Sequence, residues 1–268
     1  MPVTEGRKRD TVLGLTIVAG LAFVLLARPV IFAPVPVSAG VQEVPGYVKA
    51  RLGAQSGKPV HGIDVSHYQG VIHWPVVAEA GLAFAYMKAT DGATYQDPSF
   101  STNIANAADT GLKLGAYHFF EADDEPQQQL ANFLSTIRGK PLNLTPMVDV
   151  EVKDSQAVSE LKQRLSLFLQ QVKQATGCIP LVYSYSSFWQ SDIGPQFNDY
   201  PFWLADYASK PTPPPGVKNW QIWQYSESGT VQGISAPVDM DVMVEGAAGL
   251  AQLECDYSGD MLMGQGHD

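Results

Sequence analysis

Short runs of hydrophobic, β-branched and aromatic residues alternate along the chain with segments in which hydrophobic residues recur every three or four positions. The periodic segment at residues 157–175 predicts an amphipathic helix that ends at Gly177, and residues 127–137 predict a second helix. The runs predict eight strands, at residues 60–65, 82–89, 112–119, 145–152, 179–185, 201–207, 220–225 and 238–244.

The order of these elements predicts an α/β fold. Helices between hydrophobic strands indicate parallel crossover units and a sheet buried on both faces. Toward the C-terminus the helical pattern fades, and four prolines within residues 211–215 predict a loop before the last two strands. We therefore expect residues 59–250 to form a single irregular (β/α) TIM-like barrel. Residues 251–268 are expected to form a C-terminal tail, disordered or loosely packed from Cys255 onward.

The N-terminus has the pattern of an export signal. Three basic residues at positions 7–9 precede an uncharged, mostly apolar run at residues 11–27. This run lies between the usual lengths of a cleaved signal and of a membrane-spanning helix, so residues 1–39 are either a retained anchor or a signal peptide removed after about Ala39. The protein is expected to be exported, and residues 40–58 to link the segment to the folded domain.

Composition and charge narrow the functional classes. Hydrophobic residues make up 45% of the chain and charged residues 16%, which is typical of a soluble globular protein. The net charge is −10, and it is −12 without residues 1–39, which argues against nucleic acid as a partner. Cys178 and Cys255 lack the spacing of a zinc site or a redox pair, and the sequence leaves open whether they form a disulfide. We expect neither a cofactor nor a metal, and a monomeric protein.

The candidate chemistry lies where hydrophobic runs end in polar residues, because the active site of a β/α barrel gathers at the C-terminal ends of its strands. In Asp149-Val150-Glu151 the two carboxyl groups stand two residues apart on a predicted strand and so point to the same face. Crowding and desolvation raise the pKa of one such carboxyl, which gives the acid and the carboxylate that glycoside hydrolysis requires.

Other polar and aromatic residues are candidates with competing interpretations. Asp64 ends the first run, but from the residues alone an N-cap or turn carboxylate is the favoured interpretation. Its neighbours His61 and His67 match no strong metal-ligand pattern. His118 is either a hydrogen-bonded barrel residue or a substrate contact. Late aromatic residues either pack in the core or stack on sugar rings. The substrate contacts that we predict are Tyr117, His118, Lys88, Tyr185, Trp203, Trp223 and Tyr225.

Several motifs, in order, resemble those of the family 25 glycoside hydrolases, the Chalaropsis-type lysozymes. The resemblance covers roughly residues 59–245. Two positions depart from the common family pattern: Asp91 stands where Glu is usual, and His73 stands where Asp is usual. The motifs that carry the resemblance are HGIDVSHYQG (61–70), FAYMKATDG (84–92), DPSF (97–100), GAYHF (115–119), MVDVE (147–151), WQY (223–225) and VDMDV (238–242).

The resemblance implies an irregular β/α barrel that hydrolyses the β-1,4 bond between N-acetylmuramic acid and N-acetylglucosamine in peptidoglycan. By position, Glu151 resembles the general acid and Asp149 its partner carboxylate, while Asp64 and Asp239 resemble supporting acidic residues. The route is open among inverting, covalent retaining and substrate-assisted hydrolysis, of which we favour the last. The alternative function is a catalytically inactive, membrane-tethered protein that binds peptidoglycan.

Overall fold

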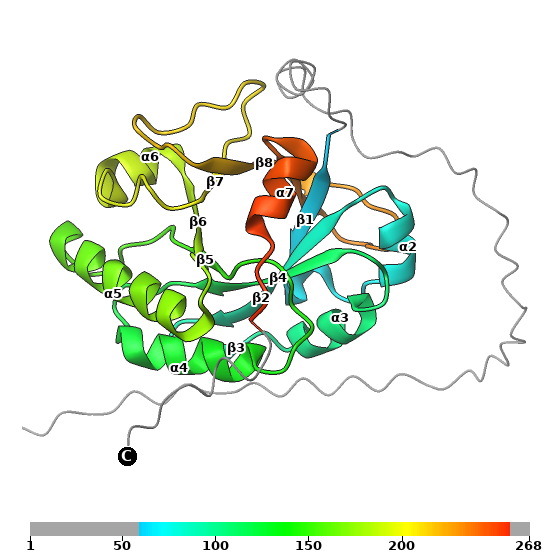
Figure 1. The fold of residues 1–268 in the computed structure, drawn as a ribbon, viewed down its shortest axis with the longest axis horizontal. Helices are drawn as coiled ribbons and strands as arrows, with labels where there is room; N and C mark the ends of the chain where they lie inside the picture. The colour runs from blue at the N-terminus through cyan, green and yellow to red at the C-terminus, as the bar shows by residue number, and fades with distance from the viewer. Residues whose placement is uncertain (1–58, 258–268) are drawn as a thin grey trace, which may run out of the picture. The chain divides into compact units, whose positions relative to one another are not determined.

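The computed structural model of the protein describes residues 59–257 (Figure 1). The predicted export segment at residues 1–39, the predicted linker at residues 40–58 and residues 258–268 lie outside this range. Within the described part of the chain, no helix is both long enough and apolar enough to cross a membrane.

Eight strands close into a barrel, as the hydrophobic runs predict. Each strand pairs with the next along the chain, and the last one pairs with the first. A ninth strand, β3 (Tyr95–Gln96), was not predicted and pairs antiparallel with the end of β2. The barrel strands are β1 (His61–Val65), β2 (Phe84–Asp91), β4 (Lys113–Phe119), β5 (Met147–Asp149), β6 (Leu181–Tyr185), β7 (Phe202–Ala205), β8 (Trp220–Gly229) and β9 (Val238–Met243).

The direction of the strands changes at one place in the barrel. All pairs of barrel strands from β1 through β8 are parallel, whereas β9 is antiparallel to both β8 and β1. The connection between β8 and β9, residues 230–237, contains no helix and is too short to return the chain to the opposite end of the barrel. The start of β9 therefore lies at the same end as the C-terminal ends of the other strands.

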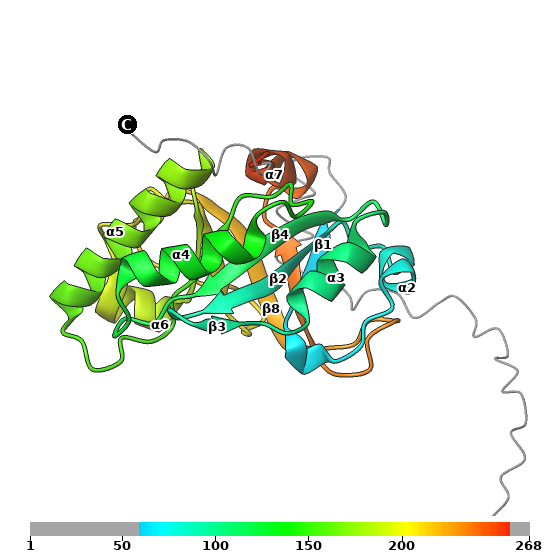
Figure 2. The ribbon, with the colours of Figure 1, turned by 90° about the horizontal axis from the view of Figure 1, so that it is seen from below.

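Helices cover the outside of the parallel strands. Figures 1 and 2 show α4 and α5 side by side on one flank and α2 and α3 on another. The two predicted helices are α4 and α5, while the shorter ones were not predicted because one or two turns carry little periodic signal. The α-helices are α2 (Trp74–Glu79), α3 (Phe100–Ala107), α4 (Pro126–Ile137), α5 (Val158–Thr176), α6 (Ser186–Phe188) and α7 (Gly246–Leu253).

The longest helix, α5, follows its sequence pattern closely. Leu161, Leu165, Phe168 and Val172 recur at three- and four-residue steps and are fully buried against the sheet. The helix ends where Gly177 adopts a left-handed conformation with φ of 75°, which a residue with a Cβ adopts only at a cost. The chain then turns into β6.

The barrel interior is filled by inward-facing side chains, as in other small barrels. Aromatic rings fill the part of the interior away from the C-terminal ends of the parallel strands, and two glycines make room for them. A Cβ on Gly62 would lie 2.3 Å from the ring of Phe84, and a Cβ on Gly115 would lie 2.2 Å from the ring of Tyr86. The polar inward residues are therefore confined to the end at which the parallel strands finish.

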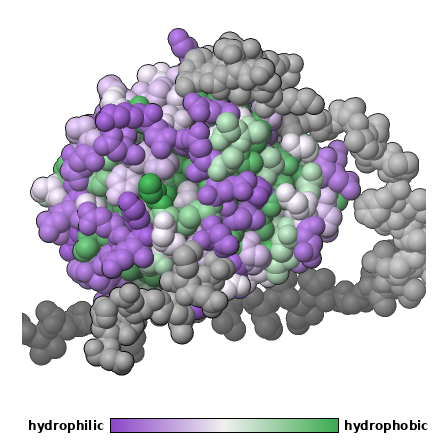
Figure 3. Space-filling model, in the orientation of Figure 1, coloured by the Kyte–Doolittle hydropathy of each residue, from purple (hydrophilic) through white to green (hydrophobic). Residues whose placement is uncertain are grey.

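Hydrophobic side chains also fill the layer between the strands and the outer helices. Polar residues cover much of the face shown in Figure 3, and apolar residues appear there only in scattered patches. Because the strands are buried on both faces, their sequences read as nearly continuous hydrophobic runs.

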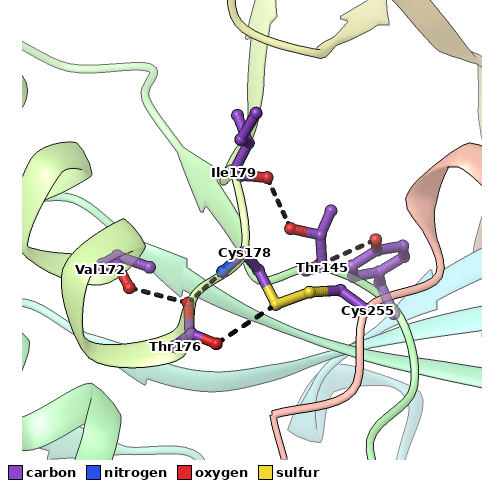
Figure 4. The surroundings of a disulfide bond; sticks show 7 residues. Thr145, Val172, Thr176, Cys178, Ile179 and Cys255 are labelled. Atoms are coloured by element: carbon purple, nitrogen blue, oxygen red, sulfur yellow. Dashed lines mark hydrogen bonds between the residues drawn. A yellow bond between two sulfur atoms is a disulfide. The ribbon is translucent and has the colours of Figure 1, made fainter.

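The C-terminal residues that the structure describes pack against the barrel, which differs from the predicted loose tail. α7 extends to Leu253, Glu254 forms a bridge with Leu144, and the Tyr257 side chain is buried. Cys255 also forms a disulfide with Cys178, just beyond α5, which ties this segment to the barrel (Figure 4). A disulfide between cysteines 77 residues apart was not predictable from their spacing, because the pairing depends on which segments the folded barrel brings side by side.

Candidate active site

A cavity of about 260 Å³ opens at the end of the barrel where the parallel strands finish. Five carboxyl groups line it, and four of them, Asp64, Asp149, Glu151 and Asp239, were predicted. The residues that line the cavity are Asp64, Tyr117, Met147, Asp149, Glu151, Tyr183, Tyr207, Gln224, Glu227 and Asp239. The cavity is therefore polar and strongly acidic.

Asp64 and Asp239 face each other across neighbouring strands. Asp64 lies near the end of β1 and is paired in register with Asp239 near the start of β9. Directly opposed residues on an antiparallel pair point to the same face, with Cβ atoms about 4.5–5.5 Å apart. The reversed direction of β9 thus brings a residue from the beginning of a strand into a site formed by strand ends.

Asp149 and Glu151 form the second carboxyl pair, and they flank Val150 as the sequence predicts. Val150 is fully buried in the outer hydrophobic layer, while both carboxyl groups point into the cavity. The two side chains are in hydrogen-bonding contact. Burial raises the pKa of both carboxyls, and the negative charge of Glu151 raises the pKa of Asp149 further. The hydrogen bond between them also raises the pKa of Asp149, whereas it lowers the pKa of Glu151. The pair is therefore built to hold a proton between its members.

Asp64 is held by a polar network. Its Oδ2 accepts a hydrogen bond of 2.7 Å from Nε2 of Gln224. The Oε1 of Gln224 accepts in turn from the hydroxyl groups of Tyr183, at 2.9 Å, and Tyr207, at 2.8 Å. Burial and the charge of Asp239 raise the pKa of Asp64, whereas the bond from Gln224 lowers it.

Charge in the cavity is poorly compensated. Burial raises the pKa of Asp239 to about 6, with a further contribution from Glu227. The nearest cation with an effect on the pair is Lys88, whose charge lowers the pKa of both Asp149 and Glu151. Lys88 itself donates to Asp91 at 2.6 Å and lies 4.8 Å from the centre of the Phe119 ring.

Two further predicted contacts lie at or beside the cavity. Tyr117 lines it from β4. Tyr185 lies at the end of β6 with 37% of its surface exposed, and its hydroxyl donates a long bond of 3.4 Å to the backbone oxygen of Glu151. Exposed aromatic surface beside the carboxyl pair is suited to stacking on a sugar ring.

Four other predicted substrate contacts are not among the residues that line the cavity. His118 is fully buried between Thr90 and Gln129, and burial lowers its pKa to about 4. Trp203 and Trp223 have no exposed surface. The Tyr225 hydroxyl is buried and forms no hydrogen bond.

The physical reason is the alternation of side chains along a strand. His118 follows Tyr117, so it points outward to the helices when Tyr117 points inward. Trp223 and Tyr225 likewise flank Gln224, which is the inward residue of the WQY motif. Trp203 does point inward, but it lies below the cavity among the aromatic rings of the core.

Sequence analysis missed several residues of the site. Tyr183, Gln224 and Glu227 line the cavity, and none of the three was among the predicted site residues. The signal for Gln224 was present: an amide in the middle of a hydrophobic, buried strand must find partners inside the protein. Among residues 59–257, no group of three or more His, Cys, Asp or Glu side chains is arranged to hold a metal ion.

A barrel with a cavity of paired carboxyls at its C-terminal end is the arrangement of a glycoside hydrolase. Comparison with known proteins agrees, since the sequence pattern of glycosyl hydrolases family 25 matches residues 63–234. The chain belongs to this family and is a glycoside hydrolase.

Individual relatives cover most of the described domain. Lysozyme M1 of Streptomyces globisporus is 34% identical over 217 residues, which are 75% of this chain and 74% of that protein. The uncharacterized protein YegX of Escherichia coli K12 is 37% identical over 188 residues, 68% of this chain and 69% of that protein. The crystal structure of the bacterial lysozyme from Streptomyces coelicolor superposes with a TM-score of 0.67 at 34% identity, covering 76% of this chain and 99% of that one.

Proposed function

We propose that the protein is an active muramidase that cleaves the β-1,4 bond between N-acetylmuramic acid and N-acetylglucosamine in peptidoglycan. The observation that carries the proposal is the convergence of Asp64, Asp149, Glu151 and Asp239 in one cavity. Relatives named as lysozymes in Streptomyces and Clostridium and as an N,O-diacetylmuramidase in Chalaropsis support the substrate.

Glu151 is the proposed general acid. It is half-buried at the mouth of the cavity, where a glycosidic oxygen can reach it, and burial raises its pKa. The hydrogen bond with Asp149 and the charge of Lys88 oppose this effect of burial on the pKa of Glu151. When Glu151 carries the proton of the pair, it can donate it to the leaving oxygen as the bond breaks. Tyr117 and Tyr185 are the proposed substrate contacts nearest to this group.

Asp149 is the proposed partner in a substrate-assisted route. The acetamido oxygen of the substrate attacks C1, the bond to the leaving oxygen breaks, and Glu151 supplies the proton to that oxygen. Asp149 stabilises the resulting oxazolinium, and water then opens it while Glu151 takes a proton back. The carboxyl of Asp149 is suited to this role because its Oδ1 is buried and accepts no hydrogen bond from the protein.

A membrane-tethered protein that binds peptidoglycan without cleaving it is the alternative function. Such a protein would keep the cavity and its aromatic rim, but it would not need the carboxyl pair. Because all four carboxyls are present and placed together, we favour the enzyme.

The test is release of reducing ends from purified peptidoglycan by the full-length protein and by Glu151→Gln. The variant keeps the shape of the side chain but has no proton to donate, so the rate should fall by about 10²–10⁴ while glycan binding persists. Glu79→Gln, on the exposed end of α2, is the matched control and should cleave like the wild type. Wild-type rates in Glu151→Gln would contradict the assignment, and an inactive wild type would favour the binding protein.

We also propose that the protein acts outside the cytoplasm, held there by residues 1–39 or released after their removal. The basic flank and apolar run of this segment support export. The Cys178–Cys255 disulfide supports it independently, because structural disulfides form in oxidising compartments.

A further inference from the structure

Asp241 is a buried carboxyl directly below the catalytic cavity, and the proposed mechanism does not use it. It lies on β9 two residues after Asp239 and points into the barrel, where its side chain has no exposed surface. Its Oδ1 accepts a hydrogen bond of 3.1 Å from Nε1 of Trp203. No donor of the protein reaches its Oδ2.

The groups around Asp241 cannot neutralise a negative charge. Its carboxyl is in hydrogen-bonding contact with that of Asp64, and Asp239 adds a second acidic neighbour. Two other titratable groups lie near Asp241 on the outer side of the strands: Tyr225 on β8, and His61 on β1, whose ring bonds to the Asp241 backbone. His61 is buried, which lowers its pKa and leaves it neutral. An ionised Asp241 would thus be a buried, uncompensated charge, which is strongly unfavourable.

One proton must therefore lie between Asp64 and Asp241, and their surroundings indicate where. Asp64 lines the cavity and accepts the amide hydrogen of Gln224, which stabilises its carboxylate although the side chain is buried. Asp241 has only the indole of Trp203, which already occupies one oxygen. A proton on the other oxygen satisfies both groups, since Asp241 then donates to Asp64.

We propose that Asp241 is a positioning residue that stays protonated at the working pH and donates a hydrogen bond to Asp64, fixing the orientation of that carboxylate in the cavity. Burial and the charge of Asp64 both raise the pKa of Asp241, in agreement with this direction of the bond. The kinetic consequence rests on the proposed muramidase function, whereas the protonation state does not.

The protonation state can be measured without any activity assay. In protein labelled with ¹³C at the aspartate carboxyl carbons, the resonance that is missing in Asp241→Asn identifies Asp241. We expect this resonance in the wild type to keep the shift of a protonated carboxyl between pH 5 and pH 8. A carboxylate shift in this range would overturn the proposal, whether or not the protein cleaves peptidoglycan.

Kinetics test the positioning role. Asp241→Asn can still accept from Trp203 and donate to Asp64, so kcat should stay within about threefold of wild type with an unmoved pH profile. Asp241→Leu removes the donor, and kcat should fall roughly 10- to 100-fold with little change in KM. Met243→Leu, deeper on the same face of β9, controls for altered packing.

Two kinetic results would overturn the proposal. A pH–rate profile shifted by about one unit in Asp241→Asn would mean that a negative charge had been removed. Wild-type kcat in Asp241→Leu would mean that the bond to Asp64 is unimportant. If Asp241→Leu does not fold, the Asn profile and the carboxyl resonance decide the question.

Discussion

Gln224 and Asp64 are joined by a hydrogen bond of 2.7 Å that crosses the barrel from β8 to β1. The same amide accepts from two tyrosine hydroxyls through its oxygen, so its orientation is fixed by three partners. An amide held in this way presents its N–H only to Asp64. Gln224 therefore fixes the orientation of the Asp64 carboxyl in the cavity.

Substitution of Gln224 by Leu should lower kcat roughly 10- to 100-fold, because a hydrogen bond to a charged group contributes about 1.5–3 kcal/mol. Steady-state kinetics on a soluble muropeptide oligomer measure the effect. Gln221→Leu is the matched control, since Gln221 is a buried glutamine at the opposite end of β8 and bonds to Gln252 instead. Equal losses of kcat in the two variants would show that the effect is one of packing.

The substrate-assisted route predicts retention of configuration at the anomeric carbon, with no glycosyl ester on any carboxyl of the protein. NMR of the first-formed anomer from a muropeptide or chitin oligomer measures this directly. An oligomer whose acetamido groups are replaced by hydroxyls should not be cleaved, because the nucleophile is missing. An inverted product would exclude the route but not the muramidase assignment.

Stability should depend on pH through Asp239, because burial raises its pKa from the usual 3.8 to about 6 in the folded protein. Between these two pH values the folded protein binds a proton at Asp239 that the unfolded protein does not bind. The stability that this proton contributes to the folded state is fully present below about pH 4 and is lost as pH rises through 6. Thermal unfolding of Asp239→Asn should therefore show a higher Tm than wild type at pH 7, by a few degrees.

The difference in Tm between Asp239→Asn and the wild type should disappear in an acidic buffer. Near pH 4 the wild-type carboxyl is protonated in the folded state, and the two proteins should then unfold at similar temperatures. Asp109→Asn, at an exposed position just beyond α3, is the control and should leave the difference between pH 4 and pH 7 unchanged. A lower Tm for Asp239→Asn at pH 7 would contradict the prediction.

Removal of the disulfide should affect stability without affecting catalysis. Cys178 precedes β6, at the end of the barrel opposite the cavity. Closing a loop of 77 residues is worth about 4 kcal/mol by chain entropy, so the double variant Cys178→Ala, Cys255→Ala should lose about 5–15 °C in Tm. Its kcat at 25 °C should stay near wild type. A reductant should lower the Tm of the wild type and leave that of the double variant unchanged.

Export can be tested with an epitope at the C-terminus of the full-length chain. If residues 1–39 direct translocation with the basic flank inside, protease should reach the epitope only when the outer face of the membrane is accessible. Replacing the three basic residues at positions 7–9 with Asp should reduce the exported fraction. Recovery of the unaltered protein in the cytoplasm would contradict the proposal.

The sequence by itself determined the strands of the barrel and identified four acidic residues of its cavity. Hydrophobic runs located all eight barrel strands, and the three- to four-residue period of α5 located its buried stripe. The two-residue spacing of Asp149 and Glu151 correctly placed both carboxyls on one face. These features are local, because they depend only on the repeat of a strand or a helix.

The tertiary structure decided which face of each strand points inward. A barrel strand is buried on both sides, so hydrophobicity alone does not distinguish Tyr117 from His118 or Gln224 from Trp223. Closure of the barrel makes that choice, and the antiparallel β9 brings Asp239 opposite Asp64 and Asp241 beneath them. Partners that lie far apart in sequence meet only once the chain has closed, which is why the amide network, the disulfide and the buried acid below the cavity were not predictable from the sequence.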